Sequence, residues 1–182
     1  MEKTIGQYNE QLDKCKSLFR KKTKDYGTAW RILRTSSLTD QLLIKANRIR
    51  TIEEQGEQKV NDPIDGEYIG LVNYSLMALI QMDLPENAPI ELDPSKAVEL
   101  FEEKAGICKR LMEAKNHDYG EVWRDMRRSS LTDLILQKLY RIKQIEDNEG
   151  TTIVSEGLDA NYSDIVNYAL FALIKIDEQL DK

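Results

Sequence analysis

The sequence contains few of the residues that usually build a catalytic or metal centre. Its 182 residues include one histidine, His117, and two cysteines, Cys15 and Cys108. The position equivalent to His117 in the repeat described below is Lys24, so no duplicated Ser-His-Asp triad exists. The cysteines lack the spacing of a metal site and lie in expected helices, so we expect them to be reduced and buried.

The sequence also lacks long apolar stretches. No apolar run approaches the about 20 residues of a membrane-spanning helix, so we expect no membrane partner. The first ten residues, MEKTIGQYNE, contain no apolar signal segment, which predicts a cytoplasmic protein. The net charge of −6 argues against general nucleic-acid binding. With 32% charged residues and only 9 glycines and 4 prolines, the composition is typical of a helical protein.

What the sequence does contain is one string that occurs twice. KTKDYGTAWRILRTSSLTD begins at Lys22, and KNHDYGEVWRDMRRSSLTD begins at Lys115. The similarity continues over most of the chain, with close to half of the positions identical and one extra residue in the second copy near Glu149. Such similarity indicates a duplicated unit. The aligned segments are 12–55 with 105–148 and 56–83 with 150–177.

A proline-rich segment separates the two copies. LPENAPIELDP, residues 84–94, holds three of the four prolines, and we interpret it as a linker. Asp93 followed by Pro94 is typical of a helix N-cap with proline in the first helical position. The predicted organisation is therefore unit one at 1–83, the linker at 84–94 and unit two at 95–182.

Each unit is expected to form three long helices and one short helical piece. Gly27 and Gly120 are expected to end the first helices. The last helix of each unit is the most apolar, so we expect the two last helices to pack against each other at the centre. This pattern predicts an all-α fold in which the duplicated unit forms a pseudo-two-fold helical bundle. The expected first and last helices are 5–24, 67–83, 95–117 and 161–177, with polar loops at 55–64 and 147–158.

The junction RTSSLTD or RRSSLTD, which begins the third helix of each unit, has two interpretations. Ser37 with Asp40, and Ser130 with Asp133, have the spacing of a capping box. A helix N-terminus with hydroxyl and guanidinium groups nearby also suits a phosphate, although the aspartates would repel it. Both interpretations stay open. The recurring phosphate-binding candidates around this junction are Arg31, Arg34, Arg124, Arg127, Ser129 and Ser130.

Two cations recur on one face of the third helix. Lys45 and Arg48 of unit one correspond to Lys138 and Arg141 of unit two. Lys138 falls on an otherwise apolar stripe, and a cation near a helix core needs a carboxylate or a ligand. We therefore treat all four residues as candidates for binding phosphate.

The last helix of unit two offers Asp164 and, three residues later, Asn167. These side chains can hold a hard cation, or Asp164 can pair with Lys138 while the amide binds backbone. Both alternatives remain open. Unit one has Gly70 at the position of Asp164, with Glu67 one turn earlier. The candidate ligands for Mg²⁺ are Asp118, Asp164 and Asn167, with Asp25 as a weaker candidate.

The aromatic residues Trp123 and Tyr168 recur as Trp30 and Tyr74, and they are expected either in the core or beside a base. The order D-Y-G, K-x-x-R-I and D-x-x-N-Y-A resembles the nucleotide modification associated domain family, a small all-α family of phages and bacteria. The resemblance covers nearly the whole chain, once per unit. Gly70 departs from the pattern and favours unit two as the better equipped. The matching residues are Asp25, Tyr26, Gly27, Lys45, Arg48, Ile49, Asn73, Tyr74, Asp118, Tyr119, Gly120, Lys138, Arg141, Ile142, Asp164, Asn167 and Tyr168.

This resemblance implies a role in nucleotide metabolism or base modification, with a nucleotide or another phosphorylated small molecule as the partner. A more distant architectural likeness is to MazG-type all-α nucleoside triphosphate pyrophosphatases, whose E-x-x-E and E-x-x-D pair is not found on matching helices here. The leading hypothesis is nucleotide binding with magnesium-dependent hydrolysis of a triphosphate. The alternative is a non-enzymatic helical interaction module whose repeated polar residues are caps and salt bridges. Catalytic residues, and the pairing of chains into a homo-oligomer, stay open.

Overall fold

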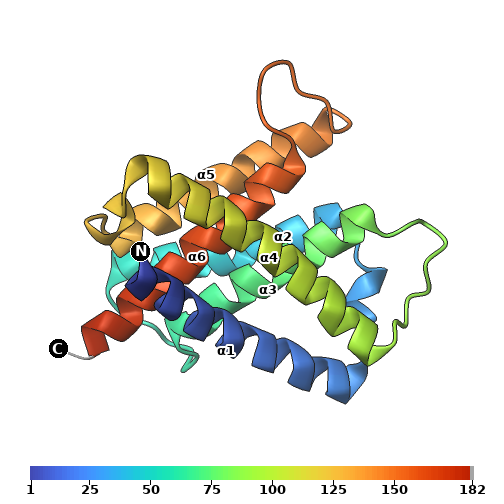
Figure 1. The fold of residues 1–182 in the computed structure, drawn as a ribbon, viewed down its shortest axis with the longest axis horizontal. Coiled ribbons are helices and arrows are strands. Elements are labelled where there is room, and N and C mark those ends of the chain that lie inside the picture. Colours follow the sequence, from blue (N-terminus) through green and yellow to red (C-terminus); the bar gives the residue numbers. More distant parts are fainter. Residues whose placement is uncertain (181–182) are drawn as a thin grey trace.

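The computed structural model describes residues 1–180, which form six α-helices and two short 3-10 helices and no strand. Figure 1 shows this arrangement, with the start of α1 and the end of α6 on the same side. The all-α prediction is confirmed, and α3 and α6 make the most extensive helix-to-helix contact, as expected. The elements are α1 (Glu2–Tyr26), η1 (Ala29–Ile32), α2 (Thr35–Gln55), α3 (Ile64–Asp83), α4 (Pro94–Tyr119), η2 (Val122–Arg124), α5 (Arg128–Asp147) and α6 (Leu158–Leu180).

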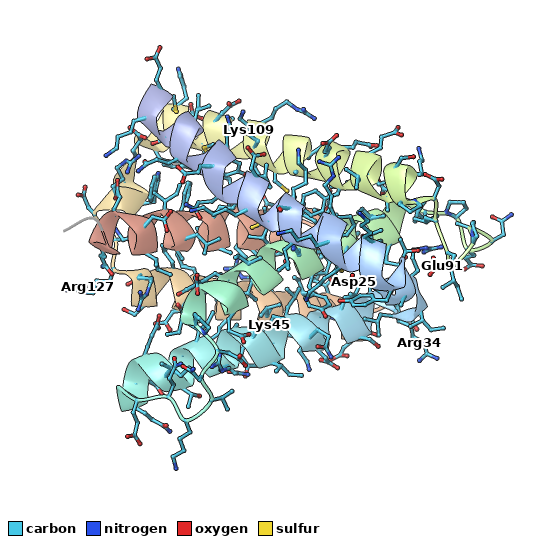
Figure 2. All side chains as sticks on the ribbon, turned by 90° about the horizontal axis from the view of Figure 1, so that it is seen from below. Asp25, Arg34, Lys45, Glu91, Lys109 and Arg127 are labelled. Carbon is cyan, nitrogen blue, oxygen red and sulfur yellow. The ribbon has the colours of Figure 1, made fainter. Side chains whose placement is uncertain are left out.

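The helices lie in three layers of two, and each layer takes one helix from each unit. Figure 2 shows α1 beside α4, then α6 with α3, then α5 with α2. The middle layer is the most apolar, because it is covered on both sides. Its residues join those of the outer layers in one hydrophobic core that includes both units. Neither unit therefore has a core of its own within the described residues.

Most predicted boundaries lie within three residues of the observed ones. Gly27 and Gly120 follow the ends of α1 and α4 with φ of 66° and 69°, a region where side chains other than glycine are strained. The carboxylate of Asp93 accepts the backbone N–H of Ser95 at 2.9 Å, so the predicted N-cap before Pro94 is confirmed.

The capping-box prediction at SSLTD is wrong. The N-caps of α2 and α5 are Arg34 and Arg127, three residues before Ser37 and Ser130, and neither has a side-chain cap. The serines thus lie inside the first helical turn. Arg34 and Arg127 already have the extended backbone angles of an N-cap residue, so each helix begins directly after its arginine.

Both cysteines are free and buried, as expected. Burial raises the pKa of the Cys15 thiol to about 12 and that of Cys108 to about 11, which keeps both thiols protonated at neutral pH. Among the described helices, none is sufficiently long and apolar to cross a bilayer.

Two equivalent hydrogen-bond clusters join the units. Thr39 on α2 contacts the hydroxyl of Tyr162 at 2.7 Å and donates to Glu146 at 2.8 Å, both from unit two. The reciprocal cluster consists of Thr132, the Tyr68 hydroxyl at 2.8 Å and Glu53 at 3.1 Å. Glu53 and Glu146 thus each bind a threonine hydroxyl of the other unit, because the pseudo-two-fold arrangement brings α2 against α5.

Candidate functional site

Unit one contains a largely enclosed cavity of about 110 Å³ between α1, α2 and α3, with η1 closing one end. Most of the recurring motif residues of this unit line it. They come from segments that are far apart in the sequence and meet only because α1 and α2 lie on opposite sides of α3. The polar and aromatic lining residues are Lys22, Thr23, Tyr26, Trp30, Lys45, Asn73 and Tyr74, and Gly27 and Gly70 also contribute.

Two lysines provide the charge of this cavity, and no aspartate or glutamate lines it. Lys22, on the last turns of α1, is exposed, and no carboxylate pairs with it among residues 1–180. The Nζ of Lys45 lies 3.6 Å from Glu67, but that carboxylate is closer to Arg48, at 2.9 Å. Lys45 also lies over the ring of Tyr74, 5.5 Å from its centroid. The lining of the cavity therefore includes two cations and no carboxylate, while Glu67 and Glu91 lie next to lining residues.

Two buried polar atoms at the cavity have no protein partner. Asn73 is 5% exposed, and its Nδ2 donates to the backbone oxygen of Cys15 at 3.1 Å, while its Oδ1 accepts nothing. The Nε1 of Trp30 is likewise buried without a partner. A buried acceptor and a buried donor left unpaired are unfavourable. The equivalent Nε1 of Trp123 in unit two is also unpaired, so only the oxygen of Asn73 distinguishes the two units.

The corresponding position in unit two is occupied by a carboxylate. Asp164 is 4% exposed and binds Lys115 at 2.6 Å and Lys138 at 2.7 Å. Burial alone would lower the pKa of Lys115, but the hydrogen bond and charge of Asp164 outweigh it and raise that pKa. Burial, followed by the charge of Asp164, raises the pKa of the nearby Tyr168 hydroxyl. Of the two interpretations of Asp164, a cation ligand or a salt-bridge partner of Lys138, the structure shows the salt bridge.

The second asparagine is fully satisfied. The Oδ1 of Asn167 accepts the hydroxyl of Tyr8 at 2.8 Å, and its Nδ2 donates to the backbone oxygen of Cys108 at 3.0 Å. The residue that corresponds to Tyr8 in the other unit is Phe101, which has no hydroxyl. The Oδ1 of Asn73 accordingly has no donor, whereas the Oδ1 of Asn167 has one.

The predicted magnesium ligands are not brought together. Asp118 lies in the last turn of α4 with a 74% exposed side chain and contacts His117 at 3.0 Å. Asp164 is bound by two lysines, and both amide atoms of Asn167 are used in the core. Asp25 is exposed. Within residues 1–180, no group of three or more His, Cys, Asp or Glu side chains is placed to hold a metal ion. Magnesium binding stays a prediction.

Arg31 and Arg124 hold other parts of the chain. Arg31 donates to the backbone oxygens of Ala88 and Pro89 at 3.1–3.3 Å, which fastens the linker to η1. Arg124 donates to Thr4 at 2.6 Å and Gln7 at 2.7 Å, which fastens the start of α1, and it stacks on the ring of Trp123. Trp123 itself packs flat against Phe171, with ring centroids 4.2 Å apart. These contacts are structural.

The remaining phosphate candidates do not converge with the lysines. Figure 2 places Arg34 and Arg127 at opposite ends of the molecule, with Lys45 between them. Arg127 and Ser129 are exposed and Ser130 is half-buried at the start of α5. Lys138 lies eleven residues after Arg127, about 16 Å further along the helix axis. The helix N-termini and the lysine pairs are therefore separate places.

Arg48 and Arg141 also differ between the units. Arg48 pairs with Glu67 and donates to the backbone oxygen of Asp62 at 2.8 Å. Arg141 is exposed and lines an open depression of about 1040 Å³ between the end of α5 and the loop 148–157. The reason is that unit two has Asn161 where unit one has Glu67. The large depression is mostly loop surface, whereas the small cavity is lined by motif residues.

A comparison with protein families matches the family called Nucleotide modification associated domain 1 at residues 22–82 and again at 115–176. The two matches cover more than half of the chain and coincide with the duplicated units. The chain belongs to this family. The first match begins at Lys22 and includes Lys45, Gly70 and Asn73 of the cavity. Comparisons with curated proteins and with solved structures found no match.

The sequence pointed to some of these residues and favoured unit two as the better equipped, because it keeps Asp164. In the structure two lysines bind that carboxylate. Lys22 recurs as Lys115 and was the available signal for a second cation. The unpaired Oδ1 of Asn73 could not be inferred from the sequence, because the equivalent oxygen of Asn167 is paired by a residue of the other unit, Tyr8.

Proposed function

We propose that this member of the family binds a nucleotide, or a closely related phosphorylated small molecule, in the unit-one cavity. The observation that supports the proposal best is that the recurring motif residues of unit one line a cavity that has two lysines and no carboxylate in its lining. Lys22 and Lys45 suit the anionic group of a ligand, and Tyr26, Trp30 and Tyr74 suit a flat ring.

The size of the cavity limits which part of the ligand enters it. A cavity of about 150 Å³ accommodates one benzene molecule, so this cavity of about 110 Å³ has room for no more than one group of that size, such as a single anionic group. Lys22 and Tyr26 at its mouth are exposed. The rest of a nucleotide would therefore lie along the surface of α1.

The test is a binding measurement with a matched pair of variants. The protein is titrated by calorimetry with each ribo- and deoxynucleoside mono- and triphosphate. Lys22→Ala is expected to weaken binding at least about tenfold, because it removes one of two cations beside the anionic group. Lys115→Ala removes the equivalent lysine of unit two and is expected to leave binding unchanged.

The outcome separates the two functional hypotheses. Equal loss in both variants would place the ligand elsewhere, and no binding of any nucleotide would favour the alternative, a non-enzymatic helical interaction module. Magnesium-dependent hydrolysis is a further part of the proposal. Its test is product analysis with magnesium or manganese, in which release of a monophosphate and pyrophosphate would identify a hydrolase.

A further inference from the structure

In unit two, a carboxylate of the protein sits where two lysines converge. Lys115 from α4 and Lys138 from α5 both bind the Asp164 carboxylate from α6, at 2.6 and 2.7 Å. Lys138 and Asp164 are buried, so this ion pair is shielded from solvent. In unit two, the position of the Asp164 carboxylate is therefore the place where the two lysines bind a negative charge.

In unit one, the same lysines are present without that carboxylate. Lys22 and Lys45 line the cavity, and Gly70 replaces the aspartate. A Cβ atom at Gly70 would lie 2.7 Å from the Cδ and Cε of Lys45. The lysine side chain therefore occupies the space where an aspartate side chain would begin. The cavity beside this position is lined by both lysines and by no carboxylate.

A second difference between the units, independent of the first, also leaves a group at the cavity unpaired. Phe101 replaces the equivalent of Tyr8, so that Asn73 keeps a buried Oδ1 without a hydrogen-bond donor. The replacements at Gly70 and Phe101 come from different helices. Each removes an internal partner from unit one that the equivalent group of unit two keeps.

We infer that the anionic group of the ligand binds between Lys22 and Lys45, in the position that Asp164 occupies in unit two. The chain then has one such site, and Asp164 permanently fills the second with the protein's own carboxylate. The inference deepens the proposed function, on which its choice of a phosphorylated ligand rests. The phosphate oxygens accept from the two lysines, and a donor group of the same ligand meets Asn73.

The experiment uses the full chain with inorganic phosphate and pyrophosphate as probes, followed by phosphorus NMR and calorimetry. Gly70→Asp restores a carboxylate beside the lysines of unit one, and Gly70→Asn adds the same bulk without charge. One probe molecule is expected to bind the natural chain. Gly70→Asp is expected to weaken this binding at least about tenfold, and Gly70→Asn by no more than about threefold.

Three results would overturn the inference: no binding of either probe, equal binding by natural and Gly70→Asp proteins, or equal loss in both Gly70 variants. Asp164→Gly is a second test, because a folded variant is expected to bind two probe molecules. A folded variant that binds only one probe molecule would contradict the equivalence of the two positions. If the variant does not fold, the comparison of Gly70→Asp with Gly70→Asn decides.

Nucleotides and the inorganic probes together distinguish this inference from the proposed function. If some nucleotide binds with equal affinity to the natural and Gly70→Asp proteins, the chain is a nucleotide-binding protein whose anion site lies elsewhere. If the inorganic probes respond as expected and no nucleotide binds, the anion site stands and the nucleotide is wrong.

Discussion

At the scale of single residues, the two units differ most where their polar groups are paired. Tyr8 completes the hydrogen bonds of Asn167 across the unit boundary, whereas Phe101 cannot do so for Asn73. Burial and the surrounding acidic groups keep the Tyr8 hydroxyl protonated by raising its pKa well above the usual value. The hydroxyl is therefore a dependable donor at all moderate pH values.

Tyr8→Phe is expected to lower the free energy of unfolding by about 1–3 kcal/mol, because it leaves the Asn167 oxygen buried and unpaired. The measurement is urea denaturation at neutral pH. The same change at the exposed Tyr140 is the control and is expected to have almost no effect. If the two variants unfolded at the same urea concentration, the hydrogen bond would not matter for stability.

At the scale of elements, the linker is a fixed part of the fold. Its backbone oxygens accept Arg31, and the Thr28 hydroxyl donates to the oxygen of Ile90 and accepts the N–H of Leu92. The carboxylate of Glu91 lies against Gly27 and accepts the N–H of Thr28 at 3.2 Å. The linker thus holds η1 at the end of the cavity. A substitution in the linker can therefore alter the cavity although the linker residues do not line it.

The N-cap of α4 provides a pH-dependent contribution to stability. The Ser95 hydroxyl and then the backbone amides of Ser95 and Lys96 lower the pKa of Asp93. Because this pKa is lower in the folded chain, the contribution is complete above about pH 4 and disappears as the pH falls through the folded value.

Asp93→Asn removes this titration and keeps a residue that can cap a helix. The variant is expected to be less stable than the natural protein at neutral pH, and the difference in unfolding free energy should shrink as the pH falls from about 5 to about 2. Urea denaturation across this range is the measurement. A difference that stays constant would show that the carboxylate charge does not contribute.

At the scale of the whole molecule, the units are interleaved. Each of the three layers takes a helix from each unit, and the Thr-Tyr-Glu clusters cross the boundary in both directions (Figures 1 and 2). The sequence-defined boundary near the linker therefore separates two copies of a sequence, while the hydrophobic core is common to both. Such a core should unfold as one cooperative unit.

This cooperativity can be tested with the two tryptophans, because Trp30 belongs to unit one and Trp123 to unit two. Trp123→Phe leaves a fluorescence probe in the first unit, and Trp30→Phe leaves one in the second. In each variant, the fluorescence transition in urea is expected to coincide with that of the far-ultraviolet circular dichroism. Fluorescence and dichroism that separate in either variant would show that the units unfold independently.

Several features were predictable because they depend on residues close together in the sequence. The helices follow from apolar spacing, the ends of α1 and α4 from Gly27 and Gly120, and the start of α4 from Asp93 and Pro94. The starts of α2 and α5 were missed, because a serine with suitable spacing need not be the cap when the backbone already turns into a helix at an arginine.

The sequence by itself determined that this is a duplicated all-α protein whose most apolar helices lie at the centre, since periodicity and repetition are local properties. Only the tertiary structure decided in which unit the motif lysines bind a buried carboxylate and in which they line a cavity. That outcome depends on pairs from distant segments: Asp164 with Lys115 and Lys138, and Tyr8 with Asn167. Whether a polar side chain is available to a ligand depends on whether another part of the chain already satisfies it, and packing alone brings those partners together.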